Sequence, residues 1–404
     1  MSARVLVVVF SDGGHLNPML SVMQRLEDAG HDLVVFSLQD DVTERCARAG
    51  LRARCATAAL AAVPAGKVEA QRSVAIAKRL ANPAWAKRWM SAVLIDPLRA
   101  QVAALRAEIA ANRPHVIVSD AMAYAGAIAA ELEGVAWATV ATTLLGFASD
   151  VATFPPDLAA KRDAAVAATG VRLTFRASDV VSPHLDIVLA YARLLGDLAP
   201  AATYAVGPAL PLARRGDERP FPFDALPTDV PIVYVAFGSH LSHGPDVYTA
   251  VTSALGPDEA FFVVVLKDLL EEPFAKALPP HVLTVEYAPQ LDLLARASVM
   301  VNHGGANSVL EALSRGCPMV VLPITYDQPL LARLVEQAGV GVGLTAAGLT
   351  VEAARTALLP LLAPDAPARQ AARQLATEGG DGAARTAELI TALAMSGSGI
   401  TRRG

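Results

Sequence analysis

A histidine stands at the point where the first apolar run of the chain gives way to a helical pattern. The run Arg4–Phe10 is typical of a buried strand, and Gly13 and Gly14 then permit a tight turn. His15 follows them directly, although the turn itself needs no imidazole. In open α/β sheets, ligands bind at the carboxyl ends of the strands. His15 is therefore either an incidental residue at the start of a helix, expected over Pro18–Ala29, or a group placed for chemistry.

A second histidine precedes a glycine pair in the latter half of the chain. The predicted strand Val299–Asn302 is followed by a histidine and two glycines, and a helix is expected over Asn307–Arg315. The unpaired N–H groups and partial positive charge of a helix N-terminus bind phosphate. Gly305 allows close backbone approach, while His303 and Ser308 add side-chain donors. The structural alternative is that the asparagine caps the helix and the histidine fills space.

The polar residues that follow have the spacing that a nucleotide sugar would require. Glu311 lies one helical turn beyond Asn307, where its carboxylate can accept from two vicinal ribose hydroxyls. Asp327 and Gln328 follow the next predicted strand at its carboxyl end, where polar groups on a loop can hold a sugar. Tyr287 and the apolar residues after it offer a flat surface for a nucleobase. Together these residues predict a nucleotide-sugar site.

The order and spacing of these motifs resemble the donor-binding signature of the UDP-glycosyltransferase superfamily, which has the GT-B fold. The resemblance covers nearly the whole chain. The motifs that carry it are Gly14–His15, Val118–Asp120, Val206–Pro208, Phe237–Ser239 and the long stretch Tyr287–Pro329. Tyr287 and Ala306 stand where the plant enzymes have tryptophan, which is closer to the bacterial natural-product, macrolide and carotenoid glycosyltransferases and leaves the base, uridine or thymidine, open.

The resemblance assigns a donor-binding role to one set of residues. It implies that the diphosphate is bound by His303, Asn307 and Ser308, with Ser239 nearby and with Gly14 and Gly305 at the glycine turns. Glu311 would bind the ribose, Gln290 and the Ala288 backbone the nucleoside, and Tyr287 the base. Asp327 and Gln328 would bind the sugar. Gln328 resembles the residue that accompanies glucose specificity in many relatives, so a glucose-type sugar is expected.

The same resemblance implies a catalytic pair in the first half of the chain. In this family the histidine after the first strand is the general base that deprotonates the acceptor hydroxyl, so His15 is expected to be catalytic. Asp120, which closes the predicted strand His115–Ser119, resembles the aspartate that orients this base and stabilises its protonated form. A structural role for Asp120 as the N-cap of a helix over Ala121–Glu133 is compatible with that function.

The elements that must position these residues alternate between short apolar runs and helical patterns, which is typical of parallel α/β architecture. We expect a GT-B protein with two Rossmann-like, doubly wound domains facing a cleft. Residues 1–210 form the expected acceptor-binding domain with the base, and residues 232–380 form the donor-binding domain. The Pro-rich and charged stretch 211–231 is a predicted linker, and residues 381–404 are a predicted C-terminal helix and disordered tail.

Composition excludes several classes of partner. The 404 residues are 53% hydrophobic and 18% charged, and the net charge of −5 does not favour nucleic acid or an anionic membrane. No segment is long enough to span a bilayer, the N-terminal apolar run is too short for a signal peptide, and three cysteines form no CxxC pair. These features predict a cytoplasmic protein without disulfides.

Other motifs carry no metal or dinucleotide chemistry. No D-x-D sequence, typical of metal-dependent GT-A transferases, is present, and His240 and His243 lack a third ligand and are expected in a solvated loop. The stretch "GVGVG", Gly339–Gly343, follows a predicted helix rather than a strand and is interpreted as a turn. No metal or cofactor beyond the nucleotide-sugar donor is expected.

The expected function is inverting, metal-independent transfer of a sugar from a UDP- or dTDP-sugar to a hydroxyl of a small hydrophobic acceptor, such as a natural product. Two alternatives stay open: a carotenoid or lipid glycosyltransferase at the membrane surface, and an inactive nucleotide-sugar-binding auxiliary protein. The presence of both His15 and Asp120 argues against the second. The acceptor would be contacted by residues 63–95 and by residues 142–183, which lack clear periodicity and are expected to be irregular. The protein is expected to be a monomer or homodimer without stable membrane insertion.

Overall fold

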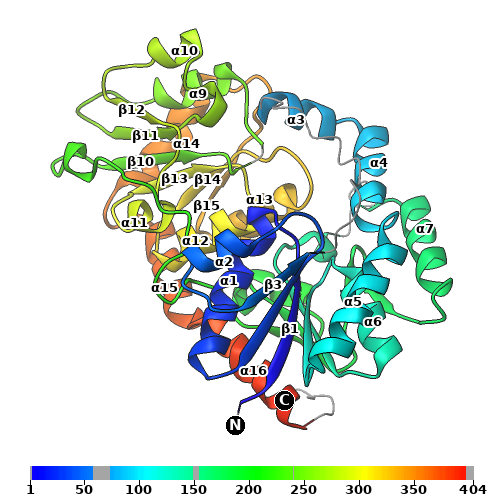
Figure 1. Ribbon diagram of the computed structural model, residues 1–404. Helices are drawn as coiled ribbons and strands as arrows, with labels where there is room; N and C mark the ends of the chain where they lie inside the picture. The colour runs from blue at the N-terminus through cyan, green and yellow to red at the C-terminus, as the bar shows by residue number, and fades with distance from the viewer. Residues whose placement is uncertain (1, 58–72, 149–153, 240, 397–404) are drawn as a thin grey trace. The chain divides into compact units, whose positions relative to one another are not determined.

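The computed structural model describes residues 2–57, 73–148, 154–239 and 241–396, which form two compact units (Figure 1). Unit 1 consists of residues 1–69, 83–217 and 381–404, and unit 2 consists of residues 70–82 and 218–380. The chain thus enters unit 2 briefly at residues 70–82, and its C-terminal segment returns to unit 1. The stretch predicted as a linker is divided between the two units at residue 217, and the predicted tail 397–404 lies outside the described residues.

Unit 1 is built on a parallel sheet of seven strands in the order β3-β2-β1-β4-β5-β8-β9. The strands are β1 Arg4–Val9, β2 Asp32–Ser37, β3 Arg54–Thr57, β4 Val116–Asp120, β5 Trp137–Ala141, β8 Leu185–Val188 and β9 Thr203–Ala205. Runs of valine, isoleucine and leucine form these strands because helices cover both faces of a parallel sheet, so side chains on both faces are buried. The two strands predicted in this half, Arg4–Phe10 and His115–Ser119, are confirmed as β1 and β4 to within one residue at each end.

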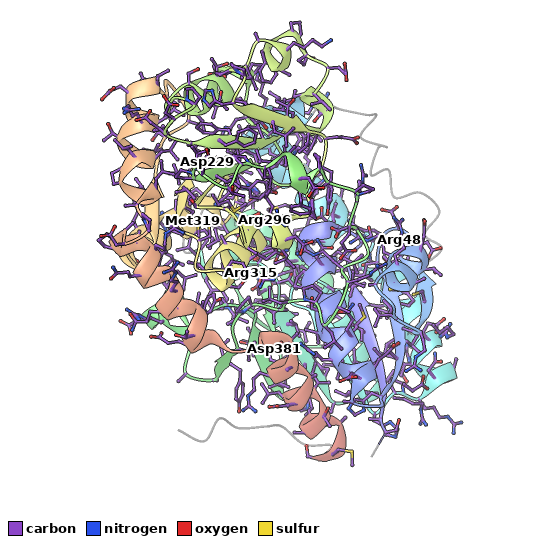
Figure 2. The ribbon with its side chains drawn as sticks, turned by 90° about the vertical axis from the view of Figure 1, so that its left-hand side faces the viewer. Arg48, Asp229, Arg296, Arg315, Met319 and Asp381 are labelled. Atoms are coloured by element: carbon purple, nitrogen blue, oxygen red, sulfur yellow. The ribbon has the colours of Figure 1, made fainter. Side chains whose placement is uncertain are left out.

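Helices from distant parts of the sequence cover the two faces of this sheet. On one face, α1 (Gly13–Asp28) and α16 (Gly382–Ser396) pack together and share a core with alternate residues of the strands. Asp381, labelled in Figure 2, lies directly before α16 and forms an ion pair with Arg25 of α1. On the other face lie α5 (Leu98–Asn112) and α6 (Tyr124–Glu133), which contact each other (Figure 1). The apolar side of α16 explains why the C-terminal helix belongs to unit 1.

The first helix begins earlier than the sequence predicts. α1 starts at Gly13 rather than Pro18, because the side chain of Asp12 caps it and accepts a hydrogen bond from the Gly14 N–H at 2.8 Å. Neither glycine has a positive φ, so the expectation that they supply a permissive turn is wrong. His15 therefore lies in the first turn of α1, directly beyond the carboxyl end of β1.

Residues 142–183, expected to be irregular, contain regular structure where they are described. A helix, α7 (Pro156–Ala167), is followed by an antiparallel pair, β6 (Thr174–Arg176) and β7 (Asp179–Val181). The strands have three residues each, which is too short to produce a readable alternation of polar and apolar residues. The remaining helices of unit 1 are α2 Thr43–Arg48, α4 Pro83–Leu94 and α8 Ala192–Leu195.

Unit 2 is built on a parallel sheet of six strands in the order β12-β11-β10-β13-β14-β15. The strands are β10 Ile232–Ala236, β11 Phe261–Val265, β12 Val282–Val285, β13 Val299–Asn302, β14 Met319–Val321 and β15 Gly341–Gly343. The helices are α3 Ser73–Leu80, α9 Pro245–Thr252, α10 Pro273–Lys276, α11 Gln290–Leu294, α12 Ala306–Ser314, α13 Gln328–Gln337, α14 Val351–Leu362 and α15 Pro367–Gly379. Arg315 and Met319 bracket the connection from α12 to β14 (Figure 2). Together the two sheets confirm the predicted α/β class.

The glycine-rich stretch interpreted as a turn contains the edge strand β15. Gly339, with φ +65°, ends the preceding helix, but residues Gly341–Gly343 pair in parallel with β14. A Cβ atom on Gly341 would lie 2.1 Å from the carbonyl oxygen of Met319, so the strands pair closely only because residue 341 has no side chain. The turn prediction therefore holds for Gly339 and is wrong for Gly341–Gly343, which form a strand.

Strand order explains where functional groups gather in each unit. In unit 1 the order reverses between β1 and β4, and the register pairs Val8 with Ser119, so the carboxyl ends of these two strands are adjacent. In unit 2 the same reversal occurs between β10 and β13, where Ala236 pairs with Asn302. Ligands of doubly wound sheets bind at such switch points. His15 and Asp120 lie at the first, and Ser239 and His303 lie at the second.

Candidate active site

The two predicted catalytic residues of unit 1 are in direct contact. The Nδ1 atom of His15 lies 2.8 Å from Oδ2 of Asp120, and the Asp120 carboxylate is buried while the His15 side chain keeps 19% of its surface exposed. The other carboxylate oxygen, Oδ1, accepts a hydrogen bond from the Met122 N–H at 2.9 Å. Asp120 does not cap a helix, because α6 begins only at Tyr124 with Ala123 as its N-cap. The carboxylate is therefore fixed by the turn after β4 and directed at the imidazole.

A third residue, which the sequence analysis missed, completes this contact. The hydroxyl of Thr142 lies 2.8 Å from Asp120 Oδ2 and 3.0 Å from His15 Nδ1. A hydroxyl carries one proton, so it donates to the carboxylate and accepts from Nδ1–H. This arrangement keeps a proton on Nδ1 of the neutral ring and leaves Nε2 as the basic nitrogen. Thr142 directly follows β5, the neighbour of β4, and that position at a strand end was the available signal.

Surrounding carboxylates control the protonation of His15. Burial alone would lower its pKa, but the charge and hydrogen bond of Asp120, together with the charges of Asp12 and Asp179, outweigh burial and raise the pKa to about 9. The imidazolium form is thus favoured in the unliganded protein at neutral pH. Only those molecules in which His15 has lost its own proton can accept a proton from a hydroxyl.

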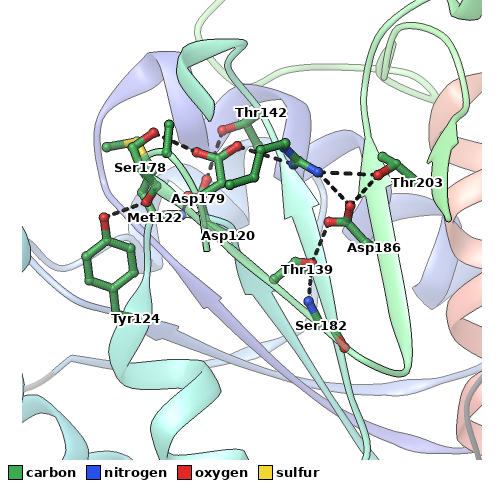
Figure 3. Close-up of polar contacts among 12 residues, drawn as sticks. Asp120, Met122, Tyr124, Thr139, Thr142, Ser178, Asp179, Ser182, Asp186 and Thr203 are labelled. Atoms are coloured by element: carbon green, nitrogen blue, oxygen red, sulfur yellow. Dashed lines mark hydrogen bonds and ion pairs between the residues drawn. The ribbon is translucent and has the colours of Figure 1, made fainter. Parts of the chain in front are cut away.

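Asp179 belongs to a buried polar network beside Asp120 (Figure 3). Its Oδ1 accepts from the Ser178 hydroxyl at 2.9 Å, and Arg176 lies 3.5 Å from Oδ2. Arg176 also forms a 2.8 Å ion pair with Asp186, whose carboxylate accepts hydrogen bonds from Thr139 and Thr203. Burial raises the pKa of Asp179 to about 7, despite the nearby guanidinium. The network was missed because it depends on the short strands β6 and β7.

The donor residues predicted in unit 2 surround the N-terminus of α12. Gly305 is the N-cap, without a side-chain hydrogen bond, so the structural explanation that Asn307 caps the helix is wrong. Gly304 has φ +82°, and a Cβ there would lie 2.9 Å from Val321 Cγ1 and 3.0 Å from the Gln328 carbonyl oxygen, which explains the glycine. Asn307 is partly buried and Ser308 is buried in the first turn of the helix.

His303 is a buried, neutral imidazole at this helix N-terminus. Its side chain is 8% exposed, and within the described residues its Nδ1 atom is buried without a hydrogen-bond partner. Burial, aided by the charges of Lys267 and His243, lowers the pKa of His303 to about 3. Against expectation, His243 is not in a solvated loop: it is buried, and its Nε2 lies 2.8 Å from the carbonyl oxygen of Leu322. His240 lies outside the described residues.

The predicted nucleoside and ribose contacts come together as a hydrogen-bonded pair. Gln290, the first residue of α11, donates from Nε2 to Oε2 of Glu311 on α12 at 2.7 Å. The hydroxyl of Tyr234, on β10, donates to the side-chain oxygen Oε1 of Gln290 at 3.3 Å. Glu311 is 6% exposed, so its carboxylate is held in place by its neighbours before any ribose binds.

The predicted sugar contacts lie at the start of α13. Asp327 is the N-cap residue of this helix and is buried. The side-chain oxygen of Gln328 accepts backbone hydrogen bonds from Ile324 at 2.7 Å and Thr325 at 2.9 Å. The side-chain oxygen of Gln328 thus shapes the loop after β14.

Four further predicted donor residues are Tyr287, Ala288, Ser239 and Gly14. One face of the Tyr287 ring is covered by Arg219, whose guanidinium carbon lies 5.2 Å from the ring centre. The next residue, Ala288, is buried, and Ser239 is exposed in the loop after β10. Gly14 lies in unit 1 beside His15, whereas all the other predicted donor residues lie in unit 2.

Among the described residues, no cluster of three or more histidine, cysteine, aspartate or glutamate side chains has a geometry suited to a metal ion. In the same part of the chain, no helix is both long and apolar enough to cross a bilayer.

Residues 256–393 match the family model "Erythromycin biosynthesis protein CIII-like, C-terminal domain". An uncharacterized UDP-glucosyltransferase of Bacillus subtilis is 29% identical over 136 residues, which is 34% of each chain. The chain thus matches about a third of the length of that relative. Demethyllactenocin mycarosyltransferase of Streptomyces fradiae is 25% identical over 87% of this chain and 77% of its own.

Solved structures resemble the chain over nearly its whole length. The glycotransferase of kitacinnamycin has a TM-score of 0.75 and 25% identity and covers 97% of this chain and 99% of its own. The glycosyltransferase VinC, solved in complex with dTDP, has a TM-score of 0.69 and 21% identity, with coverage of 97% and 99%. With the two doubly wound sheets and the signature residues at their switch points, these matches show the GT-B fold and support the UDP-glycosyltransferase superfamily for this chain.

Proposed function

We propose that the protein transfers a sugar from a UDP- or dTDP-linked donor to a hydroxyl of a small hydrophobic acceptor, with inversion at the anomeric carbon. The observation that carries the proposal is the contact of His15 with both Asp120 and Thr142 at a strand switch point. A histidine so held has one basic nitrogen, Nε2, and a carboxylate that stabilises its protonated form. General-base removal of a hydroxyl proton requires that combination.

In the proposed reaction the acceptor hydroxyl gives its proton to Nε2 of His15 as its oxygen forms a bond to the anomeric carbon. The bond from that carbon to the diphosphate oxygen breaks, and its electron pair leaves with the nucleoside diphosphate. Attack opposite to the leaving group inverts the anomeric configuration. Unit 1 thus activates the acceptor, while unit 2 holds the donor through the N-terminus of α12, His303 and Glu311.

The donor assignment has support from two sides. The hydrogen bond between Gln290 and Glu311 and the N-terminus of α12 support a ribose and a diphosphate held in unit 2. One structural relative was solved with dTDP, and one sequence relative is described as a UDP-glucosyltransferase. We propose a glucose-type sugar because Gln328 can still donate from its amide nitrogen. The mycarosyltransferase relative makes a deoxysugar the alternative.

A panel of donors tests this function. The protein is incubated with UDP- and dTDP-linked glucose and with dTDP-linked deoxysugars, together with aromatic and polyketide alcohols, and products are followed by mass spectrometry. The expected result is a hexosylated acceptor from a glucose-type donor. Exclusive use of a deoxysugar would refute the sugar assignment. Absence of binding to both UDP and dTDP in calorimetry would refute the function itself.

A further inference from the structure

A lysine that no sequence motif marks lies in the donor region of unit 2. Lys267 directly follows Leu266 at the carboxyl end of β11, the strand next to β10. Its Nζ atom donates to the carbonyl oxygens of Gly238 and Leu241, both at 2.7 Å. These two carbonyls flank Ser239 in the loop after β10, so the lysine holds the loop that carries a predicted phosphate contact. The backbone of Lys267 has φ +51°, a left-handed conformation that residues other than glycine seldom adopt.

The charge of this lysine is not neutralised by an ion pair within the described residues. Its hydrogen bonds there are the two to carbonyls, whereas an ammonium has three donors. The adjacent carboxylate, Asp268, accepts hydrogen bonds from the N–H and hydroxyl of Ser73 at 2.8 and 2.7 Å. Burial lowers the pKa of Lys267 to about 8, so the ammonium form still predominates at neutral pH. A partly buried cation held on carbonyl groups retains its attraction for an anion.

Lys267 also lies next to the buried histidine of the donor site. A Cβ atom on Gly238 would lie 2.7 Å from the His303 ring, so the residue that accepts from Nζ is in contact with that ring. Lys267 is the charged group that acts most strongly on His303. Because His303 is neutral, the predicted phosphate contacts at the N-terminus of α12 carry no full positive charge. A diphosphate bound there would need a full positive charge nearby.

We propose that Lys267 supplies the positive charge that binds the diphosphate of the donor and stabilises the nucleoside diphosphate as it leaves. This inference rests on the proposed function. The two carbonyls orient the ammonium, and its third N–H bonds to a phosphate oxygen. As the bond between the anomeric carbon and the diphosphate oxygen breaks, the electron pair moves onto that oxygen, and the ammonium opposes the added negative charge. No proton moves to or from Lys267 in this step.

Calorimetry with the full chain tests the proposal, using UDP and dTDP as probes and uridine and thymidine as probes without phosphate. Lys267→Met removes the charge and the loop contacts, Lys267→Gln keeps a donor without charge, and Lys267→Arg keeps the charge. Lys276→Met is the matched control, because Lys276 is an exposed lysine of the same unit. Melting temperatures are recorded for every variant.

The Met and Gln variants are expected to bind both diphosphates about tenfold to hundredfold more weakly, with nucleoside affinity unchanged and with a weaker dependence on salt. The Arg and control variants are expected to stay close to wild type. The Gln variant keeps the test valid if the Met variant does not fold. Unchanged diphosphate affinity in folded variants, or equal losses for diphosphates and nucleosides, would overturn the proposal. If the wild-type protein binds neither diphosphate, the proposed function fails instead, and this inference fails with it.

Discussion

At the scale of single residues, the protonation state of His15 links structure to activity. The neighbouring carboxylates raise its pKa to about 9, and a general base must be unprotonated to act. We therefore expect kcat/KM to rise with pH and to level off above about pH 9.

In Asp120→Asn the rise of kcat/KM with pH should occur at lower pH, because removing the charge that raises the pKa of His15 lets that pKa fall. Initial rates between pH 6 and 10 check the shift. Asp28→Asn, at the exposed far end of α1, is the control. If kcat/KM of Asp120→Asn rises over the same pH range as that of the wild type, a group other than His15 controls the pH dependence.

Thr142 gives a second prediction at the same scale. Thr142→Val keeps the shape of the side chain but removes the hydroxyl shared by His15 and Asp120. The loss of such a hydrogen bond costs about 1–3 kcal/mol when a buried partner is left unpaired. Thus kcat should fall about tenfold, with an altered pH profile, and Thr142→Ser should restore both. An equal fall in the Ser and Val variants would assign Thr142 a packing role only.

At the scale of elements, the edge strand β15 depends on a missing side chain. In Gly341→Ala, the new Cβ would overlap the carbonyl oxygen of Met319, so β14 and β15 must move apart. We expect the free energy of unfolding to fall by about 1–3 kcal/mol. Gly343→Ala, whose Cβ would lie 3.3 Å from the flexible Glu336 side chain, should cost less. Urea unfolding measures both. An equal effect in the two variants would contradict this packing account.

The long elements were predictable because their apolar patterns are strong, whereas the short ones were not. The strand that ends at Asp120 and the strand that ends directly before His303 were predicted to within a residue, since central parallel strands are continuous apolar runs. The start of α1 was missed because its cap depends on Asp12, which lies among residues typical of a turn. Arg176 and Asp179 were missed because only pairing between two three-residue strands brings them beside β4.

The site residues divide in the same way. His15, Asp120 and the residues around α12 were predicted from the sequence because a family signature marks them. Thr142 and Lys267 carry no motif, and only the neighbouring strands place them beside the site. The glycine pairs show that one pattern has two causes, since Gly304 needs its positive φ and Gly14 does not.

At the scale of the whole molecule, the proposed function requires no metal. The N-terminus of α12 and the ammonium of Lys267 would meet the charge of the diphosphate. Turnover should therefore be unchanged in EDTA, as measured by product formation with and without the chelator. Complete loss of activity in chelator, restored by Mg²⁺ or Mn²⁺, would contradict the prediction.

The proposal assigns the base to unit 1 and donor binding to unit 2, and this separation gives the most direct test of the account. His15→Ala removes the proposed base from unit 1 and leaves the proposed donor residues of unit 2 untouched. Loss of general-base catalysis typically lowers kcat by about 10²–10⁴-fold. The measurement is kcat for His15→Ala, with UDP and dTDP affinity and melting temperature recorded on the same preparation. We predict a loss of that size in kcat, with unchanged nucleotide affinity and a wild-type melting temperature. Near-normal turnover at the wild-type melting temperature would show that His15 is not the base.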